Sequence, residues 1–391
     1  MGDSMKYNFY YDETEHSRKI NFKTITADNY YDSFITAIVG WNDNMESELE
    51  KKYDEFETKF QQRKTKGEIK SSTFKSSQFE YGFASFNKDN IEMLNELLSI
   101  IDNNITILLS SESKIEQIIN QLFCNYHTDK EYNIDSMKYS IIKSLLIYHP
   151  ADVLNRIYYS PNTIVNALKS FYEKRIELNR NNLKLKRIEN KTFIEIIQIL
   201  NSINPIVDIE WDYRYSFDCL YRFLEKNQIT DYNLFIDKEG RAQHTMTSAT
   251  KSGLKNVDEL PSEQHFGIRM ADMLCGITGK MTKSLCAALH KNENNDILTK
   301  NLLDRKWFEL NNQQLDLYKK LYRILSKDNS YCFIGTLYAD DTVAFLALLD
   351  FMNHFNSIDD IIINMEPEHC NAYMIYCLKD YFRKKNFPFN T

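Results

Sequence analysis

The hydrophobic period of this chain changes twice along its length, and those changes constrain its fold more than any other feature. Short β-rich runs at residues 8–12, 19–24 and 34–41, separated by polar turns, predict three adjacent antiparallel strands. From Ile91 the apolar residues recur at helical spacing instead. The β period returns at residues 231–237, and a further helix begins near His265. These patterns predict an α/β fold interrupted by a long helical segment.

The chain has 391 residues, more than a single hydrophobic core usually holds. We expect residues 1–87 and 229–285 to form one α/β core. Residues 88–228 are expected to be a helical insertion, and residues 286–391 a mostly helical C-terminal region. Within that region an apolar segment at 331–338 is also compatible with a strand. Only 10 glycines and 6 prolines agree with long helices and few tight turns.

Composition excludes several classes of protein. The seven cysteines include no Cys-x-x-Cys pair, which argues against a disulfide framework or a zinc ribbon. No apolar stretch is long enough to cross a bilayer and no signal peptide is recognisable, so we expect a soluble, cytoplasmic protein without membrane contacts. A net charge of −7 argues against a general nucleic-acid coat. Neither a P-loop nor a Gly-x-Gly-x-x-Gly signature is present.

Two predicted strands end in aspartate. Alternation in the first strand places Asn8, Tyr10 and Asp12 on one face, with Asp12 at the carboxyl end. The strand at 231–237 ends in Asp237. Ordinary turn chemistry explains either residue taken alone, because aspartate commonly ends strands.

A third aspartate, Asp272, lies on the apolar side of the helix that begins near His265. An unpaired carboxylate facing a core is costly, so it needs cations, hydrogen bonds or a metal. A salt bridge to a buried arginine is the simpler alternative, for which Arg269 is a poor candidate because it projects elsewhere. Gly276 and Gly279 would let this helix approach a sheet closely.

Three short motifs resemble the bacterial domain-of-unknown-function family 3800 (DUF3800), a ribonuclease H-like group. The sequence Tyr10-Tyr11-Asp12-Glu13-Thr14 is similar to the family's Asp-Glu-Ser-Gly opening, and Ile268-Arg269-Met270-Ala271-Asp272-Met273-Leu274 is similar to its Leu-Gln-Leu-Ala-Asp-Leu closing motif. Glu68-Ile69-Lys70-Ser71 resembles a weaker Glu-Leu-Lys motif. The match covers about residues 5–85 and 230–285. Thr14-Glu15 in place of Ser-Gly, and Arg269 in place of Gln, depart from the family pattern.

The resemblance implies a ribonuclease H-like core with a mixed five-stranded sheet. It also implies an order of acids: the first closes strand one, the second follows strand three, the third closes strand four, and the last lies on the final core helix. Carried onto this chain, the catalytic and metal-binding set is Asp12, Glu68, Asp237 and Asp272. Glu13 matches the opening motif, but it faces the other side of the strand, so we expect it to support the site from behind.

Four carboxylates suit two divalent cations, Mg²⁺ or Mn²⁺, which would promote phosphodiester hydrolysis without a nucleophilic side chain. We therefore expect a metal-dependent nuclease acting on RNA or DNA, and the resemblance suggests a role in bacterial defence against phage or mobile elements. His265 is either a proton shuttle for Asp272 or an ordinary surface histidine. The competing hypothesis is a catalytically silent ribonuclease H-like sensor or scaffold that binds a partner protein through its helical regions.

Two basic segments are candidates for nucleic-acid contacts. Their residues are Lys64, Lys66, Lys70 and Lys75 in the first, and Arg175, Lys184, Lys186 and Arg187 in the second. The alternatives are a solvated loop for the first and the wet face of an amphipathic helix for the second. Asp54 together with Glu68-x-Lys70 also matches a restriction-type nuclease pattern, yet Asp54 lies in a highly charged helical run. Oligomeric state is left open.

Overall fold

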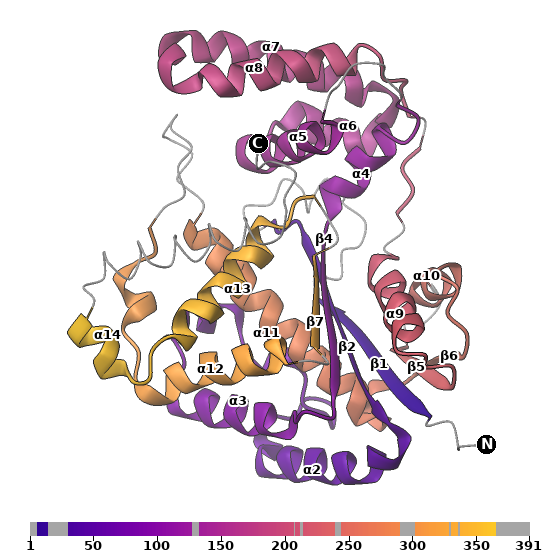
Figure 1. The fold of residues 1–391 in the computed structure, drawn as a ribbon, viewed down its shortest axis with the longest axis vertical. Coiled ribbons are helices and arrows are strands. Elements are labelled where there is room, and N and C mark those ends of the chain that lie inside the picture. The colour runs from indigo at the N-terminus through magenta and orange to yellow at the C-terminus, as the bar shows by residue number, and fades with distance from the viewer. Residues whose placement is uncertain are drawn as a thin grey trace.

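A six-stranded mixed β-sheet forms the centre of the molecule (Figure 1). The computed structural model describes residues 6–14, 30–126, 133–206, 208–211, 214–238, 244–289, 302–327, 330–334 and 337–364. In spatial order the strands run β6-β5-β1-β2-β4-β7. Their bounds are Tyr7–Thr14 for β1, Ser33–Asn42 for β2, Thr106–Ser113 for β4, Tyr232–Asp237 for β5, Val257–Leu260 for β6 and Ser330–Ile334 for β7. The expected strand at 19–24 falls outside the described residues.

Strand β1 lies near the middle of this sheet and has one parallel and one antiparallel neighbour. It pairs antiparallel with β2 and parallel with β5. Strand β2 pairs antiparallel with β4, while β5 with β6 and β4 with β7 are parallel pairs. Because the parallel neighbours β1 and β5 run in the same direction, their carboxyl ends meet at one edge of the sheet.

One face of the sheet is covered by the long helix α11, Phe266–Leu289, which packs on β1 and β2. Further helices complete the core on this side: α2 (Glu46–Lys59), α3 (Lys88–Ile100), α12 (Asn312–Ser326) and α13 (Asp340–Asn353). The short strand β3 (Glu80–Phe83), which lies outside the sheet, and the helix α14 (Ile358–Asn364) contribute residues to the same hydrophobic core. The side chain of Tyr10 enters this core.

The opposite face is covered by a smaller apolar cluster. Phe9 and Tyr11 point into it from β1, as the alternation of the strand predicts, and they pack with residues of α9 (Tyr215–Lys226). Helix α10 (His244–Lys251) lies beside α9 (Figure 1). Both faces of β1 are therefore buried.

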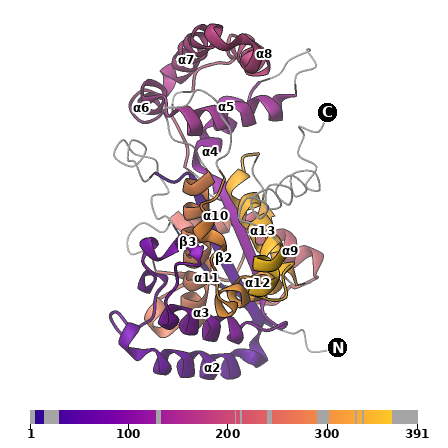
Figure 2. The same ribbon diagram turned by 90° about the vertical axis from the view of Figure 1, so that its left-hand side faces the viewer.

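A separate layer of helices extends from the carboxyl end of β4. It consists of α4 (Lys114–Leu122), α5 (Ile134–Tyr148), α6 (Ala151–Tyr159), α7 (Ile164–Leu178) and α8 (Leu183–Leu200). These helices have a hydrophobic core of their own, in which Leu168 and Tyr172 are fully buried. Figures 1 and 2 show α7 and α8 at the end of the molecule farthest from α2.

The α/β class is confirmed, but the expected domain boundaries need correction. Strand β4 lies inside residues 88–228, which were expected to be helical, and it pairs with β2 along its whole length. Strand β7 and helices α12 and α13, from the expected C-terminal region, belong to the same sheet and core. The sheet of the described residues thus has six strands rather than five. Among the described helices, none combines the length and the apolar character needed to cross a membrane.

Candidate acidic site

Asp12 and Asp237 lie side by side near the carboxyl ends of two parallel strands, although β1 continues for two residues beyond Asp12, to Thr14. The register of β1 and β5 pairs Tyr11 with Ile236, and the two aspartates occupy the next position on each strand. Neighbouring strands are about 4.8 Å apart, so the two carboxylates begin from adjacent backbone positions. Both share the face on which the rings of Tyr10 and Phe235 are 5.2 Å apart, the face covered by α11.

Helix α11 carries Asp272 to this position because it approaches the sheet closely. A Cβ atom added at Gly279 would lie 2.6 Å from Cγ2 of Thr14 on β1, and one added at Gly276 would lie 2.3 Å from Cβ and Oγ of Ser71. Contacts this short leave room for glycine alone at both positions. The close approach to the sheet is therefore confirmed for Gly279, whereas Gly276 lies against the 3₁₀ helix that begins at Ser71.

The segment containing Glu68 folds over the same end of α11. Lys66 and Gly67 both have positive φ, 55° and 92°, and form a tight turn that bridges Thr65 to Glu68. The chain then runs into the 3₁₀ helix Ser71–Thr73. Its first residue, Ser71, donates two hydrogen bonds to Asp272, from N to Oδ2 at 2.6 Å and from Oγ to Oδ1 at 2.8 Å. The hydrogen bonds that a buried Asp272 was expected to need are thus supplied by Ser71.

A buried ion-pair network holds this segment in place. Glu57 of α2 is buried, and its carboxylate lies 2.9 Å from Nε of Arg269 and 2.8 Å from Nζ of Lys64. The backbone N–H of Ile69 donates to the same carboxylate at 3.3 Å. Glu57 therefore ties α2, the Glu68 segment and α11 together. Arg269 does project away from Asp272, as predicted, and it binds Glu57 instead.

The electrostatics of the three aspartates are unfavourable as they stand. Burial raises the pKa of Asp12 well above its usual value, and the nearby carboxylates of Asp272, Asp237 and Glu13 raise it further, against a hydrogen bond from the backbone N–H of Glu13. Burial also raises the pKa of Asp237 and that of Asp272. A site of this kind favours either protonation or the approach of a cation.

Two lysines place positive charge beside these acids. Nζ of Lys70 lies 2.9 Å from Oε1 of Glu68, and its charge acts to lower the pKa of Asp237 and of Asp272. Nζ of Lys280 donates to the carbonyl oxygen of Ser71 at 3.1 Å and also acts to lower the pKa of Asp272. The second carboxylate oxygen of Glu68, Oε2, is buried and has no hydrogen-bond partner among the residues that the structure describes.

The four predicted acids therefore gather at one end of the sheet, where the charges of Asp237 and Asp272 act on Asp12 and that of Glu68 acts on Asp237. They are not drawn together as a closed ligand set: within the described ranges no group of three or more His, Cys, Asp or Glu side chains is arranged to hold a metal ion. Ser71, Lys280 and Glu57 were not predicted. The sequence indicates them only indirectly, because Gly276 shows that another segment crosses α11 closely but not which residues that segment contains.

The two residues expected to assist the site lie on different sides of it. Glu13 faces away from α11, is buried, and accepts a hydrogen bond from the hydroxyl of Tyr11 at 2.7 Å. Strand alternation predicts this placement. His265 is partly exposed and its ring stacks on Phe235, with 6.5 Å between ring centroids. A role for His265 in proton transfer stays a prediction.

In the first basic segment, two of the four lysines form ion pairs and two do not contact any of the described acids in this way. Lys66 and Lys75 are exposed, as a surface for phosphate requires. Lys64 is held by Glu57, and Lys70 by Glu68. Of these four lysines, Lys70 lies at the acidic site itself.

The second basic segment needs correction. Lys186 is buried and pairs with Glu189 at 2.9 Å, so its ammonium has little surface to offer a phosphate. The guanidinium of Arg175 lies 3.8 Å from the centre of the Tyr148 ring, which gives it a packing role within the helical layer. Lys184 and Arg187 are exposed on α8.

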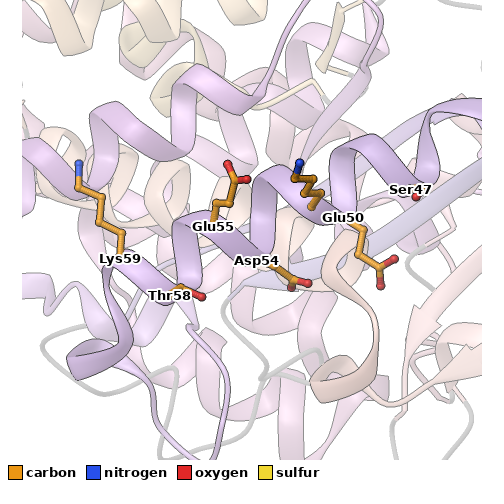
Figure 3. A pocket seen from close by; sticks show the side chains of 7 residues that line it. Ser47, Glu50, Asp54, Glu55, Thr58 and Lys59 are labelled. Carbon is orange, nitrogen blue, oxygen red and sulfur yellow. The ribbon is translucent and has the colours of Figure 1, made fainter.

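A shallow hollow of about 690 Å³ on the outer face of α2 contains Asp54. Figure 3 shows its lining side chains, all from this one helix; they are Ser47, Glu50, Lys51, Asp54, Glu55, Thr58 and Lys59. Asp54 is exposed there, whereas Glu68 is buried. The residues of the restriction-type pattern, Asp54 and Glu68-x-Lys70, thus lie in different places, one on an exposed helix surface and the others at the buried site. The structure gives this pattern no support.

Comparisons with known proteins add no relative to this description. Neither the models of protein families, nor the curated proteins, nor the solved structures contain a match to this chain.

Proposed function

We propose that this protein is a metal-dependent nuclease that hydrolyses phosphodiester bonds of RNA or DNA at the acidic site. The observation that carries the proposal is the convergence of acids from distant segments at one end of the sheet. Burial and the carboxylates of Asp272 and Asp237 raise the cost of ionising Asp12, and Glu68 adds a buried oxygen that has no hydrogen-bond partner among the described residues. Perturbed acids gathered in this way are typical of functional sites.

The residues suit a hard divalent cation such as Mg²⁺ or Mn²⁺. Carboxylate oxygens are the protein ligands that these ions prefer. Oε2 of Glu68 offers a ligand without breaking an existing hydrogen bond. A divalent ion would also offset the burial and the repulsion between carboxylates that together raise the pKa of Asp12. Closing the ligand set requires side-chain movement, because the carboxylates are not gathered tightly enough as they stand.

Bound metal ions would supply an activated water and stabilise the leaving oxygen. The chain's own residues set the geometry. Asp12 and Asp237 are fixed by adjacent backbone positions on paired strands. Asp272 is oriented by both hydrogen bonds from Ser71, and Ser71 is in turn fixed by the carbonyl contact to Lys280. No side chain needs to act as a nucleophile.

The resemblance to the DUF3800 family supports this proposal. In the chain, an acid near the end of β1 is followed by Glu68, by an acid at the end of β5, and by an acid on α11. That sequence of acids is the one the resemblance implies for a ribonuclease H-like nuclease. A role in bacterial defence against phage or mobile elements is part of the same proposal.

The test is cleavage of labelled RNA and DNA with Mg²⁺, with Mn²⁺ and with a chelator. We expect metal-dependent cleavage by the wild type. Asp12→Asn and Asp272→Asn should each lower the rate by about a hundredfold or more, the loss typical when a group that stabilises transition-state charge is removed. Asp54→Asn, on the exposed face of α2, is the matched control and should cleave at the wild-type rate.

Folding and metal binding are checked in the same samples by thermal unfolding. A metal that binds the folded protein raises its melting temperature, so Mn²⁺ should stabilise the wild type and the Asp54→Asn variant but not Asp12→Asn. The proposal is contradicted if the wild type shows neither a thermal shift with metal nor cleavage of any nucleic acid.

A second candidate function, a scaffold that binds a partner protein, is favoured by a different surface. Leu183, Ile188 and Ile194 of α8 are exposed, and two of them line a hollow of about 540 Å³ on that helix. Exposed apolar residues clustered on one helix often mark interaction sites. The scaffold function predicts that the protein neither binds metal nor cleaves nucleic acid. It also predicts that Ile188→Asp abolishes binding of the partner protein.

A further inference from the structure

The two lysines beside the acidic site are held in different ways. Lys280 donates to the backbone carbonyl oxygens of Ser71, at 3.1 Å, and Gly276, at 3.5 Å. Lys70 instead contacts a carboxylate, that of Glu68, and its side chain is 39% exposed. Carbonyl contacts at the crossing of two segments fix Lys280, whereas Lys70 can move outward on its flexible stem.

We propose that Lys70 is an exchangeable cation of the acidic site. Without metal it partly neutralises the carboxylates; when a divalent ion binds, its ammonium leaves Glu68 and contacts the phosphate of the substrate. This inference rests on the proposed function. It gives Lys70 a different role from the other basic residues of its segment, which would contact nucleic acid at a distance from the acids.

The charges around Lys70 make this exchange favourable. The ammonium of Lys70 faces three carboxylates, those of Glu68, Asp237 and Asp272. Lys280 adds a second positive charge beside Asp272. The two lysines still leave part of the negative charge of the four acids uncompensated. A divalent ion brings twice the charge and repels the ammonium at the same carboxylate.

The two oxygens of Glu68 provide the exchange position. Oε1 holds the ammonium at 2.9 Å, while Oε2 is buried and, within the described part of the chain, has no hydrogen-bond partner. An ion can thus approach Oε2 before the contact at Oε1 breaks. Because Glu68 and Lys70 are two residues apart on one segment, the released ammonium stays near the site, where it meets an incoming anion.

The experiment measures Mn²⁺ binding by the full-length chain, by calorimetry and by loss of the free-ion electron paramagnetic resonance signal. Lys70→Met removes the charge but keeps a side chain of similar length. We expect it to bind Mn²⁺ about tenfold more tightly than the wild type, the effect of removing one competing charge. Lys70→Arg keeps the charge and should bind with wild-type affinity.

Lys66→Met is the matched control, since it removes an exposed positive charge from the same segment. It should leave Mn²⁺ affinity unchanged. In assays with saturating Mn²⁺, Lys70→Met should lose cleavage mainly through weaker binding of the nucleic acid, seen as a raised KM, and Lys70→Arg should largely restore it.

The outcomes separate the two proposals. If the wild type binds Mn²⁺ and cleaves, but Lys70→Met binds Mn²⁺ with the same or lower affinity, the exchange role is overturned and the nuclease proposal stands. If neither protein binds Mn²⁺, both proposals fail together. A folded Lys70→Met is verified by its thermal unfolding in metal-free buffer.

Discussion

At the scale of single residues, adjacent acids lie in different environments, because the strand turns Asp12 toward α11 and Glu13 toward the opposite face of the sheet. Asp12 and Glu13 are adjacent acids in one motif, and strand alternation predicted that they face opposite sides, as they do. For Asp272, the cost of a buried carboxylate predicted that hydrogen bonds must exist. It could not predict Ser71 as the donor, because the two residues are 201 positions apart and nothing local links them.

Glu112 of β4 is a buried acid that offers a test independent of the acidic site. Burial raises its pKa to about 8, and the carboxylates of Glu116 and Asp218 add to the shift, while a hydrogen bond from Gln117 opposes it. An acid with a raised pKa keeps its proton in the folded state after the unfolded chain has released it. Its contribution to stability is therefore complete below about pH 4.5 and is lost as pH rises toward about 8.

We expect Glu112→Gln to flatten this decline. The free energy of unfolding at pH 8 should rise by about 1 to 3 kcal/mol relative to the wild type, with little change at pH 4.5, because the variant no longer has to ionise a buried group. Urea titrations across this pH range provide the measurement. Glu55→Gln, an exposed residue of α2, should leave the pH dependence as it is; equal slopes for Glu112→Gln and wild type would contradict the prediction.

At the scale of elements, the strands β1, β2 and β5 were predicted from short β-rich runs, whereas β4 was not. Strand β5 alternates buried and half-buried residues, and its predicted range agrees with the structure. Strand β4 is buried at every position, because sheet neighbours and helices cover both faces, so alternation is absent. Its residues are therefore expected to be helical from sequence alone. Strand β6 has four residues, too few to be located by a pattern.

The approach of α11 to the Glu68 segment depends on Gly276. We expect Gly276→Ala to lower the free energy of unfolding by about 1 to 3 kcal/mol, the usual cost of forcing an extra group into a packed contact. The new methyl group would overlap Ser71 and push it away from Asp272. Denaturant titration measures the loss.

Ala287→Leu serves as the control for this change, because it enlarges an exposed residue of the same helix. It should alter stability by less than about 0.5 kcal/mol. If Gly276→Ala is as stable as the wild type and still binds Mn²⁺ equally well, then the close contact at Ser71 is not what orients Asp272.

At the scale of the whole molecule, the structure has two main apolar cores joined through a small polar junction. The sheet and α11 belong to one core, and α5 to α8 to the other. Between them, Glu116 of α4 accepts hydrogen bonds at 2.8 Å from the backbone N–H groups of Leu337 and Tyr338. The tyrosine hydroxyl of Tyr139 donates to Asp340 of α13 at 3.0 Å. The sequence predicted the helical insertion but not this junction, whose partners lie about 200 residues apart.

Because the helical layer has its own core, a destabilising substitution in that layer should leave the stability of the sheet unchanged. We expect Leu168→Ala, at a fully buried position of α7, to cost about 2 to 5 kcal/mol within that layer. Hydrogen exchange should become faster in α5 to α8 while β1 and α11 keep their protection and Mn²⁺ binding is unchanged.

Ile107→Ala, at a buried position of β4, is the reciprocal variant and should accelerate exchange in the sheet. Uniform loss of protection throughout the chain in Leu168→Ala would mean that the two cores unfold as one unit.

The parallel pairing of β1 with β5 has a consequence for the timing of synthesis. Asp12 leaves the ribosome before its partners on β5 and α11, which follow after more than 220 and about 260 further residues; the longer stretch takes roughly 13 to 50 seconds at usual rates of elongation. Until then β1 has neither its parallel neighbour nor its covering helix. A product of premature termination before α11 therefore lacks the acidic site, so any activity of that site begins only once translation has passed this helix.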